Sequence, residues 1–137
     1  MASCGEFTEA EPEMAKVFTS LLDWIPITYL ATVRKDGAPR VHPICPIIGD
    51  GRIFVAVNEN SPKRHDLKGD RRFAMHALPD KRDAEFYMTG SVTFIEDQKT
   101  RDLITESAGH AVHDSDWLFE FNVEHVMTAH WENQGQP

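Results

Sequence analysis

Residues 85–95 alternate between apolar and polar side chains more regularly than any other part of the chain. The apolar positions are Phe86, Met88, Val92 and Phe94, and the positions between them are Tyr87, Thr89, Ser91 and Thr93. Because successive side chains of a β-strand point to opposite faces, this period of two predicts a strand with one buried face. Gly90 interrupts the alternation, and we expect a bend or bulge there that curves the sheet.

Six further short runs, rich in β-branched and aromatic residues, predict the remaining strands. They lie at residues 27–33, 40–48, 53–58, 73–78, 117–123 and 126–131. Asp36-Gly37 and Gly49-Asp50-Gly51 supply turns between the first three runs. Since strands and helices do not alternate regularly, a parallel sheet is disfavoured. We therefore predict a mainly β (α+β) fold, a six- to seven-stranded antiparallel barrel or sandwich with helices packed outside it.

Three helices are predicted, at residues 11–24, 61–69 and 97–109. The first carries one apolar stripe at helical spacing and ends before Pro26. The second begins at Ser61-Pro62, which pairs a capping hydroxyl with a proline at the first helical position. The third begins at the capping residue Asp97. Its buried residues are expected to be Leu103, Ile104 and Ala108.

Length and charge restrict the class of protein. A chain of 137 residues suits one domain with a hydrophobic core, so residues 1–137 are treated as a single domain. The net charge of −8 disfavours nucleic acid and anionic membranes as partners. No apolar run approaches the ~20 residues that cross a bilayer, and no secretory signal is recognisable, so we expect a cytoplasmic protein. Residues 1–8 and 132–137 are expected to be flexible.

Other kinds of site are disfavoured. Cys4 and Cys45 lie far apart and form no CxxC pattern, so both are expected to be free thiols. His110 and His113 lack an acidic third ligand at a helical spacing, so we predict a surface loop and no metal site. A GxSxG nucleophile elbow and a GxGxxG dinucleotide motif are both absent, which disfavours a serine hydrolase and a Rossmann unit.

Residues 61–72 hold five of the fourteen Lys and Arg residues against two Asp, a local charge of +3 in a chain of −8. A serine, a lysine and the free N–H groups of a helix start can bind phosphate, whereas a solvated helix face is the alternative. The strand at 40–48 lies nearby in the predicted meander and contains Pro43 and Pro46. Prolines in a strand indicate either a protected edge or backbone facing a ligand, and both interpretations stay open.

Several motifs follow one another along the chain. They are Ala31-Thr32-Val33, the run from Asp36 to Pro43, the run from Gly51 to Val57, Ser61-x-Lys63-x-x-Asp66-Leu67 and Asp70-x-Arg72-x-Ala74. Their order and spacing resemble those of the pyridoxamine 5′-phosphate oxidase-like FMN-binding split-barrel family, over residues 27–95 and again over 119–131. The resemblance implies a split β-barrel that forms a homodimer, with two FMN molecules bound in grooves between the subunits.

The resemblance also implies a set of cofactor-binding residues. They are Arg40, His42, Pro43, Ile44, Asn58, Ser61, Lys63 and Arg64. Ser61 and Lys63 match the family's phosphate-binding serine and lysine. Arg40 and Arg64 would be supporting cations, and Asn58 matches the polar end of the third strand. His42, Pro43 and Ile44 would lie against the isoalloxazine ring.

Two departures from the family pattern concern the substrate. The pyridoxamine 5′-phosphate oxidases proper carry a lysine near the end of the second strand, where this chain has Cys45-Pro46. They also carry an arginine- and histidine-bearing C-terminal segment that holds the substrate, where residues 131–137 of this chain contain no Lys or Arg. We therefore expect flavin binding without efficient pyridoxamine 5′-phosphate oxidation.

The sequence thus favours an FMN-dependent oxidoreductase that takes a hydride from a reduced donor and passes electrons to a small organic acceptor. No general acid or base is assigned, although His42 is a candidate proton donor. Two alternatives stay open. One is a reductase of the same fold that uses the deazaflavin coenzyme, whose longer acidic tail would occupy the basic stretch. The other is a non-catalytic flavin- or haem-binding carrier or stress-response protein.

Overall fold

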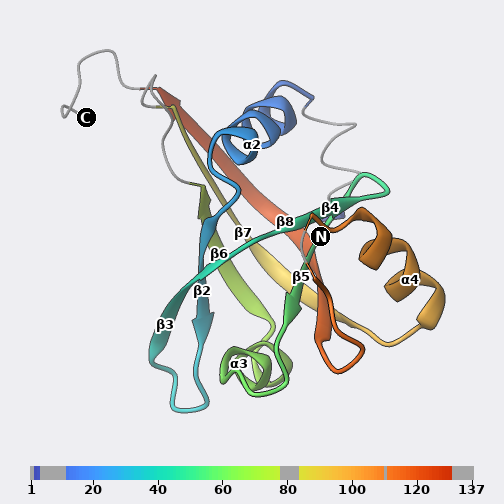
Figure 1. Cartoon of the computed structure of the whole chain (residues 1–137). Coiled ribbons are helices and arrows are strands. Elements are labelled where there is room, and N and C mark those ends of the chain that lie inside the picture. Colours follow the sequence, from blue (N-terminus) through green and yellow to red (C-terminus); the bar gives the residue numbers. More distant parts are fainter. Residues whose placement is uncertain (1, 4–11, 78–83, 110, 131–137) are drawn as a thin grey trace.

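The computed structural model describes residues 2–3, 12–77, 84–109 and 111–130, which form one curled antiparallel sheet and three helices (Figure 1). Seven strands follow the order β3-β2-β6-β7-β8-β5-β4, and the short β1 pairs with β8. Although β3 and β4 are the two ends of this order, they are consecutive in the chain. The sheet therefore closes on itself as a split barrel, and the predicted mainly β antiparallel fold is confirmed.

The strands are β1 (Ala2–Ser3), β2 (Thr28–Val33), β3 (Pro39–Ile44), β4 (Ile47–Gly49), β5 (Arg52–Val57), β6 (Arg72–Ala77), β7 (Ala84–Ile95) and β8 (Trp117–His130). The helices are α2 (Pro12–Trp24), α3 (Lys63–Gly69) and α4 (Gln98–Ser107). All described strand pairs are antiparallel.

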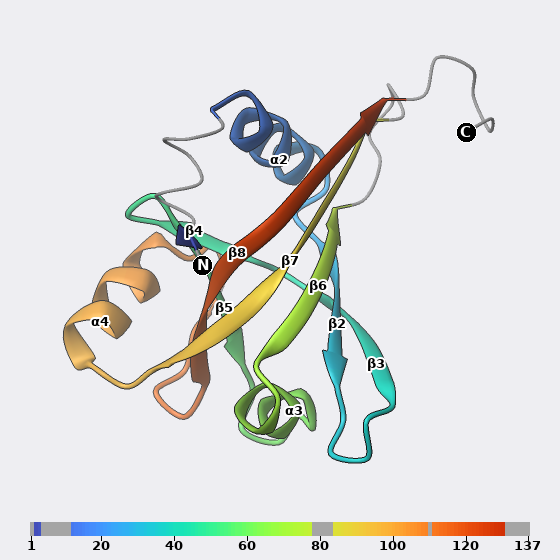
Figure 2. The ribbon, with the colours of Figure 1, turned by 180° about the vertical axis from the view of Figure 1, so that it is seen from behind.

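The longest ladder joins β7 to β8, which run side by side (Figure 2). Its register shifts between Thr89 and Gly90, where Thr89 faces His125 and Gly90 faces Val123. A Cβ atom at Gly90 would overlap the backbone oxygen of Asn122, so only glycine fits this close approach. The irregularity predicted at Gly90 is confirmed, and it increases the local twist of the sheet.

The main core fills the concave side of the sheet and includes α2. Phe18 and Leu21 of α2 are buried, and the Phe18 ring stacks on Phe86 of β7 with 4.7 Å between ring centroids. The Phe73 and Phe121 rings are also 4.7 Å apart in this core. The apolar stripe of the first predicted helix thus packs against the alternating apolar face of β7.

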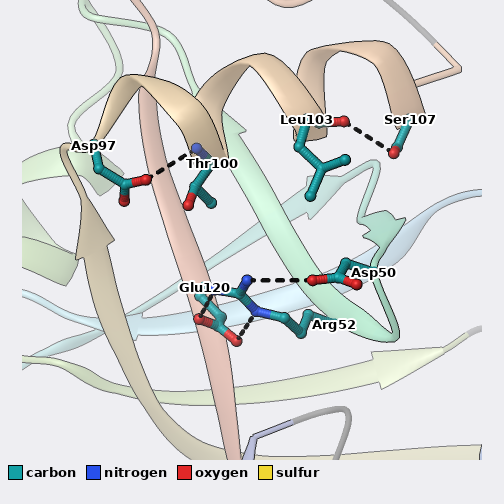
Figure 3. Close-up of polar contacts among 7 residues, drawn as sticks. All are labelled: Asp50, Arg52, Asp97, Thr100, Leu103, Ser107 and Glu120. Carbon is teal, nitrogen blue, oxygen red and sulfur yellow. Dashed lines mark hydrogen bonds and ion pairs between the residues drawn. The ribbon is translucent and has the colours of Figure 1, made fainter.

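A second, smaller core lies under α4. Ile104 is fully buried there, together with Ile47, Phe54, Ile95 and Leu118. The Asp97 carboxylate caps the helix by accepting a hydrogen bond from the Thr100 N–H at 2.9 Å (Figure 3). Leu103 is 41% exposed, so the prediction that it is buried is wrong, because this helix turns only a narrow face to the sheet.

An ion pair close to α4 joins two neighbouring strands (Figure 3). Arg52 of β5 donates from Nε and Nη2 to the two carboxylate oxygens of Glu120 in β8, at 2.9 and 2.8 Å. Glu120 is buried, and its hydrogen bonds raise the pKa of the Arg52 guanidinium. This buried pair lies among side chains on the α4 side of the sheet.

Several predicted boundaries change. The strand predicted at 40–48 is divided into β3 and β4, because Cys45-Pro46 interrupts it. The strands predicted at 117–123 and 126–131 form one strand, β8, which passes through the irregularity opposite Gly90 without ending. The Ser61 hydroxyl does not cap α3, whose capping residue is Pro62.

Parts of some predictions lie outside the described residues. Of the ends predicted to be flexible, 1–8 and 132–137, the structure describes only Ala2–Ser3, which form β1 and pair with β8. Cys4 and His110 are also outside the described residues. Cys45 is a free, exposed thiol, as predicted.

Replacing Gly90 with alanine is expected to lower the free energy of unfolding by about 2 kcal/mol or more, because the added methyl group overlaps backbone that cannot move away cheaply. Urea unfolding monitored by circular dichroism measures the change. Gly69→Ala is the matched control, since a Cβ at Gly69 meets no atom within 4 Å. Equal unfolding midpoints for the two variants would contradict the close approach.

Candidate functional site

The open edge of β3 carries few backbone donors. The bond from Arg34 N–H to Ala38 O, at 2.9 Å, closes the β2–β3 hairpin and fixes the alternation of backbone groups along β3. Every second residue turns its N–H toward β2, and the others, Pro39, Val41 and Pro43, face the open edge. Because proline has no N–H, only Val41 donates at this edge of β3. The prolines therefore protect an edge strand without the loss of a ladder bond.

The inward side of the same hairpin holds a buried carboxylate. Asp66 of α3 is 6% exposed, and its Oδ2 accepts a hydrogen bond from Thr32 Oγ1 at 2.9 Å. Arg40 Nε lies 2.8 Å from the same oxygen as an ion pair, although its N–H is not aligned for a hydrogen bond. Thr32 and Arg40 face each other across β2 and β3. One carboxylate thus joins β2, β3 and α3.

His42 lies near two cations on this inward side. Burial lowers the pKa of its imidazole most, and the charges of Lys63 and Arg40 lower it further, whereas Asp66 acts in the opposite direction. Its Nε2 is buried and has no hydrogen-bond partner among the described residues. Burial also lowers the pKa of the Lys63 ammonium. The cluster of Arg40, His42 and Lys63 therefore has more positive charge and donor capacity than its protein neighbours satisfy.

Two more of the predicted residues belong to the turn between β5 and α3. Asn58 Oδ1 accepts a hydrogen bond from the Asn60 N–H at 2.8 Å, and Asn58 O accepts one from the Ser61 N–H at 2.9 Å. This turn holds Ser61 two positions before Lys63. The Ser61 hydroxyl has no hydrogen bond within the described residues, so it remains available to a ligand.

Arg64 donates a hydrogen bond from Nη1 to Ser61 O at 3.4 Å, and it also contacts an aromatic ring. Its guanidinium lies over the Trp117 ring, 5.5 Å from the ring centroid, and Lys68 lies over the Phe94 ring at 4.1 Å. These two cations of the basic stretch therefore pack against aromatic side chains. The structure assigns Arg64 a contact with Trp117, and its role as a supporting cation for phosphate stays a prediction.

The three residues expected against the flavin ring lie in different surroundings. Ile44 is buried in the main core, and Pro43 is exposed on the opposite side of β3 from His42. Of the three, only His42 lies with Arg40 and Lys63. The structure thus brings Arg40, His42 and Lys63 together, and the contacts predicted for Pro43, Ile44 and Arg64 with a cofactor stay predictions.

A pocket of about 440 Å³ lies between the β2–β3 hairpin and α3. Its charged lining residues are Arg34, Lys35, Asp66, Asp70 and Arg72, of which Arg72 is paired with Asp70 at 2.7 Å. None of the eight predicted cofactor residues lines this pocket. The pocket and the cluster meet at Asp66, which lines the pocket and pairs with Arg40.

Asp66 and Thr32 are the residues that the sequence analysis missed. Both stand inside the quoted motifs, but Asp66 was counted there only as a negative charge in a basic stretch. The available signal for the burial of Asp66 was its position directly before Leu67, which is fully buried. Both residues turn to the buried side of a short helix. The partner of Asp66 lies 26 positions earlier in the chain, and no local pattern points to it.

Two further findings concern the described residues only. They contain no group of His, Cys, Asp and Glu side chains placed to hold a metal ion. The same part of the chain has no helix with the length and apolar character needed to span a membrane.

Comparison with known proteins identifies the family. The sequence profile described as pyridoxamine 5′-phosphate oxidase matches residues 14–135. The chain belongs to this family. No curated protein matches it. The split barrel, the edge strand with its prolines and the Ser61-x-Lys63 turn are therefore features of a pyridoxamine 5′-phosphate oxidase family member.

Solved structures support the same fold. A haem-binding protein from Mycobacterium smegmatis has a TM-score of 0.70 at 14% identity; the match covers 92% of this chain and 57% of that one, so this chain spans little more than half of its length. A NimC/NimA family protein from Clostridium acetobutylicum has a TM-score of 0.67 at 17% identity, covering 88% and 93%. HutZ, a haem storage protein from Vibrio cholerae, has a TM-score of 0.62 at 15% identity, covering 85% and 92%.

The His42 imidazole is expected to titrate below its ordinary value of about 6.5 in an NMR pH titration. Since the unfolded chain then binds the proton more readily than the folded one, this group lowers stability as the pH falls from about 6.5 through the folded-state value. Lys63→Met removes one of the positive charges that repel the protonated imidazole, so the titration midpoint of His42 should rise part of the way toward 6.5. A wild-type midpoint at or above 6.5 would contradict the burial of His42 beside Lys63 and Arg40.

Proposed function

We propose that the protein binds FMN at the cluster of Arg40, His42 and Lys63 and works as an FMN-dependent oxidoreductase. The observation that carries the proposal is the set of polar groups there that have no partner. Lys63 has no anionic partner among the described residues, and His42 Nε2 is buried without a partner. A phosphate with its ribityl chain would satisfy both. The chemistry of these residues therefore fits a flavin nucleotide.

Each residue of the cluster has a distinct role in the proposal. Lys63 and Ser61 bind the phosphate, and Arg40 adds a second cation. Burial and the neighbouring cations lower the pKa of His42 and so favour its neutral form, and its partnerless Nε2 would form a hydrogen bond with the cofactor. Bound FMN supplies hydride and electron transfer between a reduced donor and a small organic acceptor.

The protein is also proposed to be a homodimer. The outer side of the sheet exposes Val41, Tyr29 and Met127, at 63%, 46% and 44%. Across neighbouring strands, Tyr29 faces His76, His76 faces Tyr87, and Tyr87 faces Met127, so an apolar and aromatic row crosses the sheet. A second copy of the chain is the proposed cover for this face. A cofactor site completed by that copy would not form a closed pocket in one chain.

The proposed acceptor is a small organic molecule other than pyridoxamine 5′-phosphate. In this chain Cys45, an exposed thiol, and Pro46 follow β3 where the oxidases proper have a lysine. A second phosphate on the substrate would need a second cation near the flavin. Nucleic acid and membranes are not proposed as partners, since the chain carries a net charge of −8.

The absorption spectrum of the purified protein, with mass analysis of any released cofactor, tests the proposal against its alternatives. Flavin bands with released FMN support it. A colourless protein that binds added deazaflavin coenzyme supports the deazaflavin alternative. A Soret band supports a haem-binding protein, the description given to two of the similar structures. Either of the last two results overturns FMN as the cofactor.

Lys63→Ala is expected to weaken FMN binding about ten- to hundredfold, because a charge-assisted hydrogen bond of ~1.5–3 kcal/mol is lost. Quenching of flavin fluorescence measures the affinity. Lys99→Ala, at an exposed position on α4, is the control and should leave the affinity unchanged. Equal affinities for the two variants would show that Lys63 does not contact the phosphate.

Val41→Glu is expected to convert a dimer into a monomer, because it places a charge at the most exposed apolar residue of the same outer face, on β3 beside the row. Sedimentation should then give the 15.6 kDa of one chain for the variant and twice that mass for the wild type. Ile48→Glu, at an exposed apolar position of β4 outside the row, should remain dimeric. A monomeric wild type at micromolar concentration contradicts the homodimer.

A further inference from the structure

We infer that Asp66 is a positioning residue that holds the Arg40 side chain in place, so that Arg40 presents its two terminal Nη groups to the phosphate. This inference rests on the proposed function and adds a residue to it. Asp66 itself does not contact the cofactor in this account. It acts through Arg40 alone, which makes the role separable by experiment.

The Asp66 carboxylate and the Arg40 guanidinium lie next to each other. Asp66 lies 2.8 Å from Nε of Arg40, and that nitrogen is buried. No other side chain of the described residues bonds to the Arg40 guanidinium. Arg40 is therefore held at Nε, while the Nη groups, which form the fork that binds phosphate, are left without a partner. A held arginine loses less conformational freedom on binding than a free one.

The Asp66 carboxylate is buried and has two polar contacts. A buried carboxylate is unfavourable unless it is both paired and hydrogen-bonded. Asp66 has an ion pair with Arg40 and a hydrogen bond from Thr32 Oγ1 at 2.9 Å. Thr32 and Arg40 stand opposite each other on the neighbouring strands β2 and β3, so the carboxylate has one contact with each strand. Thr32 and the packing of α3 through Leu67 hold the Asp66 carboxylate, and the carboxylate in turn restricts the Arg40 side chain.

The sign of the charge effect separates this role from simple electrostatics. Arg40 and Lys63 contribute two positive charges beside His42, and Asp66 contributes one negative charge. If Asp66 acted only through its charge, replacing it with asparagine would remove repulsion and strengthen phosphate binding. If Asp66 positions Arg40, the same replacement must weaken phosphate binding. The two explanations predict opposite results for one variant.

A purely structural role is the other explanation, and the chain contains a matched control for it. Glu120 is a buried carboxylate that also pairs with an arginine, Arg52, on the α4 side of the sheet (Figure 3). Glu120→Gln therefore breaks a pair of the same kind without touching the cluster around Lys63. Loss of stability alone should affect both variants alike.

The experiment compares FMN with riboflavin, which lacks the phosphate. The dissociation constant of riboflavin divided by that of FMN, both measured by fluorescence quenching, reports recognition of the phosphate only. Asp66→Asn should reduce this ratio about three- to tenfold, as expected when one side chain must be ordered on binding. Glu120→Gln should leave the ratio unchanged. In an Arg40→Lys background, Asp66→Asn should have no further effect on the ratio.

The remaining outcomes overturn the inference. A ratio that rises in Asp66→Asn shows that Asp66 acts through its charge, and a ratio equal to that of Glu120→Gln shows a structural role. If the wild type binds neither flavin, the proposed function fails, and inorganic phosphate then decides the inference. The Arg40 Nε–H NMR signal should shift with phosphate, and Asp66→Asn should need a three- to tenfold higher concentration. An Arg40 signal that phosphate does not move, or that moves equally in both proteins, overturns it.

Discussion

The close antiparallel contact between β7 and β8 determines where every other element can lie. At Gly90 the two backbones approach too closely for any side chain, and the register shifts by one residue. Such an irregularity increases twist, and twist lets the sheet curl until its two ends, β3 and β4, are joined by a short piece of chain. In sheet order β5 is separated from β2 by three strands, yet α3, which follows β5, bonds to Thr32 of β2. The helix therefore connects the end of β5 with the start of β6, which is the neighbour of β2 in the sheet.

The contact made by α3 then explains the arrangement of the candidate site. A helix of seven residues has little stability of its own and depends on tertiary contacts. Leu67 anchors α3 in the main core, and Asp66 binds it to the hairpin. The same two contacts place Lys63 beside His42 and leave Arg64 to pack on Trp117. The cations of one short helix are thereby divided between Lys63, which lies near His42, and Arg64 and Lys68, which pack on aromatic rings.

Sequence reasoning located the elements better than the site. The alternation of residues 85–95, the cap at Asp97 and the irregularity at Gly90 depend on local rules, and the structure confirms them. Strand 40–48 was misjudged because Cys45-Pro46 divides it into β3, which pairs with β2, and β4, which pairs with β5, and a run of apolar residues does not reveal this division. The pairing of Asp66 with Arg40 depends on how α3 packs against the β2–β3 hairpin, and for that reason no spacing in the sequence predicted it.

The overall charge shows why arrangement matters more than composition at this site. A chain with a net charge of −8 repels an approaching dianion, whereas the proposed phosphate site offers it only two cations, one of which is paired with Asp66. At physiological ionic strength the repulsion is screened beyond about 8 Å. Contacts at hydrogen-bond distance are not screened in this way, so binding depends on how Arg40 and Lys63 are held. A carboxylate that reduces the local charge can therefore strengthen anion binding, provided that it fixes the direction of a neighbouring arginine.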